Sequence, residues 1–355
     1  MDMLYVEDCC EILDSMRVPI TASEREEGEY PYYGANGIQD HIADYIFDDE
    51  LVLLAEDGGN FGSRERPIAY RVSGKCWVNN HAHVLKPKTG LDVDYLCYSL
   101  MFYKVDGMVN GATRQKLTQA AMRKMQIPLR SMDKQKYIVD VLNHIIKLKE
   151  RRQQELQLLD DLIKARFVEM FGDSVLNEKG WKTKPLLDMG KCKNGMNFHY
   201  DDSGVEINCL GVGDFKDLSV IDNTEQLPTV SLNEMPSEEY LLKDDDIVFV
   251  RSNGNKALVG RSVAVYPGDI PTTFSGFCIR YRKYDNAVTI PYLLRVLKAD
   301  SIRKKMAGRG ANIQNLNQQI LGTLIIPVPP IELQMEFSDF VKQVDKSKVV
   351  VASVR

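Results

Sequence analysis

The sequence predicts an α+β protein in which two similar mixed α/β domains are separated by two long antiparallel helices that pair as a coiled-coil spacer. Three observations predict this fold. One segment recurs near the end of the chain, a long stretch without Gly or Pro follows its first copy, and both halves carry the same order of short apolar runs. The expected boundaries are a first domain over 1–132, a first helix over 133–172, a second domain over 173–330 and a second helix over 331–355.

The recurring segment aligns without a gap. GATRQKLTQAAMRKMQIPL (111–129) matches GANIQNLNQQILGTLIIPV (310–328) at a constant offset of 199 residues. The same register continues into Gln135 and Gln334. A period of this length is too long for a solenoid repeat, so it indicates two domains of one kind on one chain.

The long helix is predicted over 133–171, which contains neither Gly nor Pro and ends at Gly172. Its 39 residues would extend ~58 Å at 1.5 Å per residue, so one neighbouring domain cannot cover it. A second helical pattern starts after Pro330 and is the expected antiparallel partner. The expected seam consists of Ile138, Ile145, Leu156, Leu159, Ile163 and Phe167 on the first helix, and Leu333, Phe337, Phe340 and Val344 on the second.

The second helix is expected to be the shorter of the two. At the offset of 199, the counterpart of Phe171 would be position 370, but the sequence ends at 355. We therefore expect Ile163, Phe167 and Met170 to lack partners at the far end of the pair. An exposed apolar face of this kind favours self-association or capture of a helix from another chain.

Within each half, three short apolar runs precede a helix, as expected for a mixed α/β domain. In the first half we expect strands over 51–56, 69–73 and 81–87 and a helix from Asp94. In the second half the matching strands are 247–252, 262–266 and 276–282, followed by a helix over 291–306. Gly-rich loops connect the matching strands.

Composition is that of a soluble globular protein, with 44% hydrophobic and 27% charged residues. No apolar run approaches the roughly 20 residues that span a bilayer, so no membrane partner is expected. The N-terminus is acidic where a signal peptide is basic, and the seven cysteines are scattered. These features predict a protein of the reducing cytoplasm.

The net charge of −5 conceals a repeated pattern. Residues 1–57 and 173–249 are strongly acidic, whereas 58–132 and 250–310 are strongly basic. A local basic face, rather than the overall charge, indicates phosphate binding. The alternative is that Lys and Arg side chains only solvate two helices.

No pattern for catalysis or for a cofactor is found. The chain lacks the spacing of a dinucleotide-binding loop, a phosphate-binding P-loop and a nucleophile elbow. Histidines and cysteines never fall into metal-ligand spacing. We therefore expect no catalytic residue, no metal and no cofactor bound by this chain.

The loops instead carry the side chains that read base edges and hold phosphates. The alternative for each is a turn-forming Asn or a solvated Arg. The candidates for DNA binding are Asn36, Asn60, Arg64, Arg66, Asn79, Asn80, His81, Arg114 and Lys116 in the first half, and Arg251, Asn253, Asn255, Lys256 and Arg261 in the second.

This order of variable domain, closing motif, long helix, second domain, same motif and second helix resembles the DNA specificity subunit of type I restriction-modification systems. The phrases YYGANGIQDHI (32–42), VLLAEDG (52–58), VNNHAHVLKP (78–87) and DIVFVRSNGN (246–255) are also similar to that family. The resemblance implies two target-recognition domains, each reading half of an interrupted, asymmetric site in double-stranded DNA. The helices would set the gap and dock methyltransferase subunits.

The resemblance further implies that this subunit is not a catalyst. Adenine methylation with S-adenosylmethionine, and restriction driven by ATP with Mg, would belong to the methyltransferase and restriction subunits. One alternative is a nucleic-acid-modifying enzyme such as an adenine methyltransferase. It would need an Asn/Asp-Pro-Pro-aromatic motif, whereas the Pro-Pro pair here lies in IPVPPIEL. Another is an assembly scaffold without DNA contact.

Overall fold

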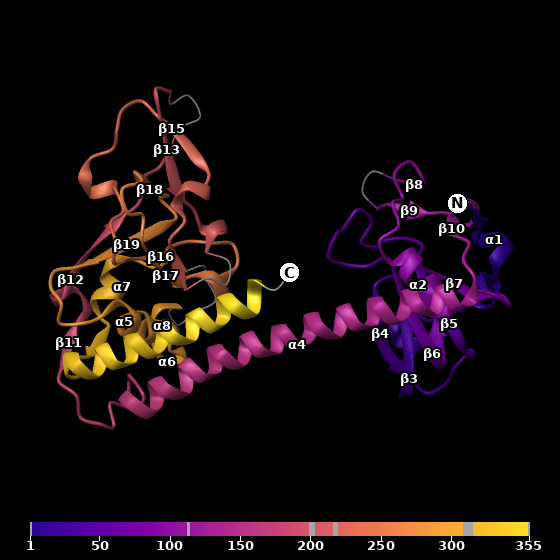
Figure 1. The fold of residues 1–355 in the computed structure, drawn as a ribbon, viewed down its shortest axis with the longest axis horizontal. Helices are drawn as coiled ribbons and strands as arrows, with labels where there is room; N and C mark the ends of the chain where they lie inside the picture. The colour runs from indigo at the N-terminus through magenta and orange to yellow at the C-terminus, as the bar shows by residue number, and fades with distance from the viewer. Residues whose placement is uncertain (1, 112–113, 199–202, 216–218, 308–314, 354–355) are drawn as a thin grey trace. The chain divides into compact units, whose positions relative to one another are not determined.

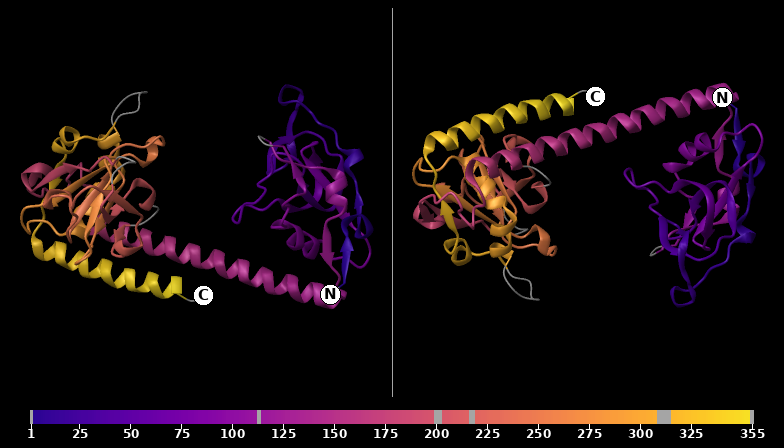
Figure 2. Two further views of the ribbon diagram at one scale, coloured as in Figure 1. Left: turned by 90° about the horizontal axis from the view of Figure 1, so that it is seen from above. Right: turned by 90° about the horizontal axis from the view of Figure 1, so that it is seen from below.

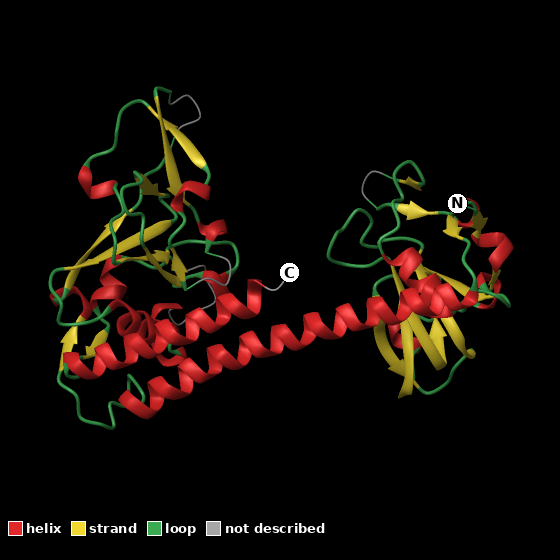
Figure 3. Cartoon of the chain, viewed as in Figure 1, coloured by secondary structure: helices red, strands yellow, loops and turns green. Residues whose placement is uncertain are grey.

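The computed structural model describes residues 2–111, 114–198, 203–215, 219–307 and 315–353. The chain divides into two compact units, Met1–Arg151 and Arg152–Arg355, with the boundary inside one long helix. Each unit combines β-sheets with a few short helices, as Figures 1 and 3 show. Among the helices of the described ranges, none has the length and apolar character needed to cross a lipid bilayer.

Unit 1 is built around a six-stranded sheet with the order β2-β7-β5-β6-β3-β4. Neighbouring strands are antiparallel except β3 and β6, which run parallel. The sheet strands are β2 (Cys10–Ile12), β3 (Glu27–Gly34), β4 (Gly37–Ile42), β5 (Phe47–Ala55), β6 (Ala69–Val78) and β7 (Ala82–Pro87). Two small sheets pair β1 (Met3–Tyr5) with β10 (Gln126–Pro128) and β8 (Val109–Asn110) with β9 (Lys116–Leu117). The helices are α1 (Val6–Cys9), α2 (Val93–Met101) and α3 (Gln119–Arg123).

The core of unit 1 lies on both faces of β5. Successive side chains of a strand point to opposite faces, and Leu51 and Leu53 belong to one apolar cluster while Val52 and Leu54 belong to another. All four are fully buried. Because both faces are covered, the strand reads as a continuous apolar run, which is why it could be predicted from sequence.

Unit 2 contains a five-stranded sheet, β12-β19-β16-β17-β14, and a three-stranded sheet, β15-β13-β18. The strands are β12 (Gly190–Asn194), β13 (Val205–Leu210), β14 (Val220–Ile221), β15 (Thr229–Leu232), β16 (Asp246–Val250), β17 (Ser262–Val265), β18 (Thr272–Phe274) and β19 (Cys278–Lys283). A separate pair joins β11 (Thr183–Pro185) to β20 (Ile325–Pro327). The short helices are α5 (Ile290–Lys298), α6 (Asp300–Ala307) and α7 (Gln318–Gly322).

The long helix α4 (Met132–Phe171) agrees with the predicted one and ends at Gly172, whose φ of +76° suits glycine. The second helix, α8 (Ile331–Ser353), lies beside the part of α4 that belongs to unit 2 in both views of Figure 2. Ion pairs join Arg166 to Glu336 and Asp160 to Lys348. Residue numbers rise along one helix as they fall along the other, so this pair is antiparallel.

The seam between α4 and α8 is buried at the residues that we expected to be exposed. Ile163, Phe167 and Met170 are buried, and the Phe167 ring lies 5.5 Å from that of Phe337. The expectation that these residues lack partners is therefore wrong, because an antiparallel partner that starts at Ile331 covers the C-terminal end of α4 first.

Exposed apolar residues occur along the whole of α4, and in its N-terminal part they are Tyr137, Val141, Ile145 and Leu148. Ile145 is 56% exposed and therefore is not a seam residue. Ile138 packs against the core of unit 1 rather than against α8. Among the other predicted seam residues, Leu156 is half-buried. The rest are buried in the core of unit 2 or pack against it: Leu159, Leu333, Phe337, Phe340 and Val344.

Two predictions of secondary structure need correction. The helix expected over 291–306 is broken at Ala299, whose extended ψ of 137° separates α5 from α6. The helix expected from Asp94 ends at Met101 rather than at Val105.

Candidate nucleic-acid interface

The closing motif holds the same place in both units. In unit 1 the backbone N–H of Leu117 donates to the carbonyl of Glu56, at 2.7 Å, just after strand β5. In unit 2 the N–H of Leu316 donates to the carbonyl of Arg251, at 2.9 Å, just after strand β16. The motif therefore fixes the loop that follows the central strand, and this loop carries most of the candidate DNA-binding residues.

A buried glutamine fixes the exit from each unit. The Gln135 side chain accepts from Asp92 N–H at 2.8 Å and donates to the carbonyls of Gly90 and Arg130, both at 2.9 Å. It therefore locks the start of α4 to the loop before α2.

Gln334 repeats this arrangement at the start of α8. It accepts from Thr289 N–H at 2.9 Å and donates to the carbonyls of Ala287 and Pro329 at 3.1 and 2.9 Å. The hydroxyls of Tyr95 and Tyr292 likewise donate to the carbonyls of Pro128 and Pro327. The repeat in the sequence thus encodes one joint between a domain and a helix, used twice.

Three candidates of unit 1, His81, Arg114 and Lys116, are bound to carboxylates. Asp57 binds His81 Nδ1 at 2.6 Å and Arg114 Nη2 at 2.8 Å, and Glu56 binds Lys116 Nζ at 3.0 Å. Arg114 and Lys116 keep 61% and 50% of their side chains exposed. The structure therefore brings these three predicted residues together at one loop, with their charges already paired.

A buried network supports this loop from behind. His83 is fully buried, with Nδ1 2.7 Å from Asp14 and Nε2 2.9 Å from the carbonyl of Leu117. Burial alone would raise the pKa of Asp14, but the hydrogen bond and charge of His83 lower it overall. Arg17 bonds to Glu56 at 2.6 Å and completes the network.

The same network offers a grouping of Asp14, Glu56 and His83 close enough for a metal ion. Both ring nitrogens of His83 already lie within hydrogen-bond distance of acceptors in the chain, Asp14 and the carbonyl of Leu117. Arg17 and Lys116 already neutralise Glu56. The arrangement is a structural ion-pair network that sequence inspection missed, because its members are far apart in the chain.

Three further candidates line a hollow of about 500 Å³ in unit 1, beside the rings of Tyr33 and Tyr70. Asn60 donates to Asn36 Oδ1 at 3.0 Å, and Asn36 donates to the carbonyl of Gly58 at 3.0 Å. Arg66 is exposed on the same wall. Amides and a guanidinium next to aromatic rings suit contact with bases.

The remaining candidates of unit 1 do not join this hollow. Arg64 lines a separate hollow with Phe102. Asn80 is exposed at the turn before β7. Asn79 is only 3% exposed, donates to Gln39 and accepts from His81 N–H. Asn79 therefore shapes the turn and cannot reach a base, contrary to the prediction.

In unit 2 the loop over 251–260 connects β16 to β17. Arg251 is half-buried and donates from Nη1 to the carbonyl of Gly276 at 3.2 Å. Asn253 and Asn255 accept from the N–H groups of Asn255 and Ala257, so their side-chain oxygens shape the loop.

Two candidates complete this loop. Lys256 begins the short helix η7 (Lys256–Leu258), and its side chain lies outside the described part of the structure. Arg261, at the end of the loop, points into a separate cavity lined by further cations. Sequence inspection singled out none of those further cations, although Arg295, Lys298 and Arg303 lie in the basic region 250–310.

The fold and the loops define a class of protein: a binding protein that presents two structurally equivalent loop sites with different side chains. A family model described as the type I restriction modification DNA specificity domain matches residues 2–158 and 178–350. The chain therefore belongs to the family of type I restriction-modification specificity subunits. Specificity subunits of this family recognise DNA sequence and are not themselves catalytic.

Similar proteins agree with this assignment. A putative type I restriction enzyme specificity subunit of Haemophilus influenzae is 27% identical over 338 residues, covering 93% of this chain and 83% of that protein. The StySPI specificity subunit of Salmonella potsdam is 24% identical and covers 83% and 67% of the two chains.

Solved structures show the same fold. The S subunit of a type I system from M. genitalium superposes with a TM-score of 0.57 at 14% identity, covering 99% of this chain and 91% of that one. A structure from a study of assembly and conformational transition of a type I system has a TM-score of 0.53 at 13% identity and covers 99% and 91%.

Proposed function

We propose that this chain directs a type I restriction-modification complex to an interrupted, asymmetric site in double-stranded DNA, with each unit reading one half of the site. One observation carries the proposal. The closing motif fixes an equivalent loop in both units, and the loops carry different candidate side chains, Asn60 and Arg66 in unit 1 and Arg251, Asn253 and Asn255 in unit 2. Two domains that read different half-sites would need the same fold with different side chains on its loops.

The same proposal assigns a role to the helices. The glutamine joints start α4 and α8 in the same way from their respective units. Helices fixed at such joints are suited to set the distance between half-sites and to offer a surface for methyltransferase subunits. S-adenosylmethionine, ATP and Mg, and the chemistry they support, would belong to the methyltransferase and restriction subunits.

The test is an exchange of one unit. Residues 1–130 are replaced by the corresponding segment of another family member, and the methylated motif is mapped in cells that also carry the methyltransferase subunit. One half of the motif should change while the other half and the gap stay the same. A change in both halves together would contradict two independent readers, and an unchanged motif would contradict DNA reading by unit 1.

A further inference from the structure

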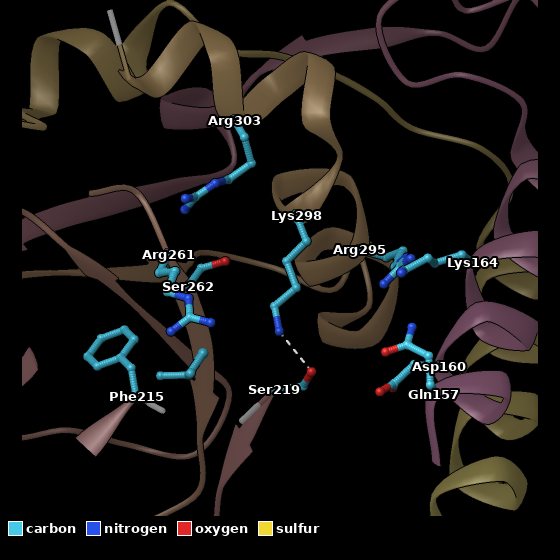
Figure 4. A pocket seen from close by; sticks show the side chains of 11 residues that line it. Gln157, Asp160, Lys164, Phe215, Ser219, Arg261, Ser262, Arg295, Lys298 and Arg303 are labelled. Carbon is cyan, nitrogen blue, oxygen red and sulfur yellow. Dashed lines mark hydrogen bonds between the residues drawn. The ribbon is translucent and has the colours of Figure 1, made fainter. Parts of the chain in front are cut away.

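Unit 2 contains a cavity of about 390 Å³ whose walls are strongly basic. It lies between α4, α5, α6 and strand β17 (Figure 4). Lys298 points into its centre and donates to the hydroxyl of Ser219 at 2.8 Å. The other cations of the lining are Lys164, Arg261, Arg295 and Arg303.

The nearby carboxylates are already engaged elsewhere. Asp160, on the α4 wall, pairs with Lys348 of α8 at 2.7 Å. Asp161 pairs with Lys164 at 2.8 Å. Asp160 also favours the charged forms of Lys298 and Arg295, and Asp300 those of Arg295 and Arg303, but the cations around the cavity outnumber these carboxylates.

Arg295, Lys298 and Arg303 form no close ion pair with any residue that the structure describes. Arg303 donates from Nη2 to the carbonyl of Ala257 at 2.8 Å, while its buried Nη1 has no hydrogen-bond partner in the described chain. An unpaired buried donor and neighbouring like charges both lower folding stability, unless an anion from outside the chain binds them.

Lys298 reflects this environment. Burial, together with the positive charges of Arg295 and Arg261, lowers the pKa of its ammonium group to about 8. An anion that binds next to this ammonium group would stabilise its charged form, because the anion replaces the favourable interaction with water that burial removes.

The cavity adjoins the candidate reading loop of unit 2. Arg261 ends that loop, and its backbone carbonyl accepts from Val250 N–H at 2.8 Å. Arg303 holds the loop from the other side through Ala257. A negatively charged ligand in the cavity would therefore lie next to the loop that carries Arg251.

We infer that this cavity binds a phosphate group, and that the phosphate comes from the DNA backbone next to the half-site read by unit 2. The inference rests on the proposed DNA-reading function and adds a site to it. Phosphate contacts of this kind fix the register of a protein on the duplex, while base contacts provide specificity.

The test compares variants of the full chain on a labelled duplex of mixed sequence, titrated at several KCl concentrations. Lys298→Met and Arg295→Met each remove a charge and keep an apolar stem. Lys243→Met is the matched control, because Lys243 is exposed, pairs with Glu238 and lies outside the cavity lining. Each cavity variant should bind about tenfold more weakly at low salt, with the slope of log affinity against log salt reduced by about one. The control should match the unmodified chain.

Thermal unfolding separates this role from a purely structural one. Removing one of several like charges should leave the unfolding temperature of Lys298→Met unchanged or raise it, while its DNA affinity falls. If that variant fails to fold, Lys298→Arg, which keeps the charge, should fold and bind DNA normally. Loss of binding by Lys298→Arg in a folded protein would overturn the inference.

The remaining outcomes distinguish the sources of the anion. If the unmodified chain binds the duplex and both methionine variants bind it equally well, the phosphate site is wrong and the DNA-reading function stands. If inorganic phosphate raises the unfolding temperature of the unmodified chain but the variants keep normal DNA affinity, the cavity takes a free anion instead. If the variants lose methyltransferase subunits without DNA, it takes an acidic protein partner. If the unmodified chain binds no duplex, both proposals fail.

Discussion

Glu56 and Arg251 occupy equivalent positions and carry opposite charges. In unit 1 the carboxylate at this position is bound by Arg17 and Lys116. In unit 2 the Arg251 guanidinium donates to the carbonyl of Gly276. Guanidinium groups pair well with guanine. Because Glu56 is buried and already paired, this position is open to a base contact in unit 2 and not in unit 1.

Arg251→Ala should weaken binding to the recognised site by about 1–3 kcal/mol and relax the preference at one base pair of the half-site. The reason is that a contact to a base edge discriminates between base pairs, whereas a contact to a phosphate does not. Affinities for the methylated motif and for its single-base variants provide the measurement. An equal loss on every sequence would place Arg251 on the DNA backbone instead.

DNA affinity should depend on pH through Lys298, whose pKa is about 8. Below pH 8 the ammonium is charged and attracts phosphate. As the pH rises from 7 to 9, the free protein loses this charge and affinity should fall, by up to about tenfold. The charged or titratable groups around Lys298 are Asp160 and Lys164 from α4, Arg261 before β17, Arg295 from α5, Arg303 from α6 and Lys348 from α8.

The contribution of Lys298 to the free energy of unfolding should change with pH in the opposite direction to DNA affinity. The unfolded chain, with the ordinary lysine value of 10.5, binds more protons than the folded chain between pH 8 and 10.5. The contribution of Lys298 to folding stability therefore rises with pH across that window. Lys298→Arg should flatten the pH dependence of DNA affinity, and an unchanged profile in that variant would show that another group titrates.

At this scale the sequence predicts residue types better than it predicts roles. An asparagine side chain can shape a turn or contact a base edge, and the sequence does not distinguish these roles. The hydrogen bonds that Asn79 and Asn253 accept from nearby backbone N–H groups show that their side-chain oxygens shape turns. Arg295 and Lys298 could not be singled out, because their meaning comes from α4, α6 and β17 meeting around them.

Among the elements, the glutamine joints are the clearest product of the repeat. Each glutamine makes three hydrogen bonds from a buried position. The substitutions Gln135→Ala and Gln334→Ala each leave buried backbone groups unpaired, so each should destabilise its own unit by about 2–4 kcal/mol.

Urea unfolding of the full chain provides the measurement, and Gln153→Ala is the control because Gln153 is exposed on α4. The two joint variants should lower stability to a similar extent, and the control should not. A neutral result for both joint variants would mean that the joints do not contribute to stability.

Element prediction succeeded where both faces of a strand are buried and failed for strands of mixed polar sequence. Strand β16 is buried throughout, and strand β5 is buried from Leu51 to Ala55, where it forms an apolar run. Strands β3, β4 and β12 carry Glu, Gly, Gln and Lys, so their place in a sheet depends on partners distant in the sequence.

For the whole molecule, the exposed apolar residues of α4 have a consequence for assembly. Tyr137, Val141, Ile145 and Leu148 follow one another at intervals of four, four and three residues, which places them on one face of the helix. We expect this face to mediate self-association of the isolated chain, in place of the C-terminal seam that the sequence had suggested.

The double variant Ile145→Glu/Leu148→Glu should reduce the mass of the isolated protein, measured by light scattering, to that of a monomer. Leu158→Glu is the control, because Leu158 is also exposed but lies on a different face of α4. If the unmodified chain is already a monomer, this expectation is wrong.

The small sheets at the base of each unit have an evolutionary meaning. Met3 pairs with Pro128 at the beginning and end of unit 1, and Thr183 pairs with Pro327 in unit 2. The chain therefore enters and leaves the folded part of each unit on one antiparallel pair. If each unit reads one half-site as proposed, recombination could exchange the gene segment for a whole unit without changing the joints. A new sequence specificity would then arise from one exchange.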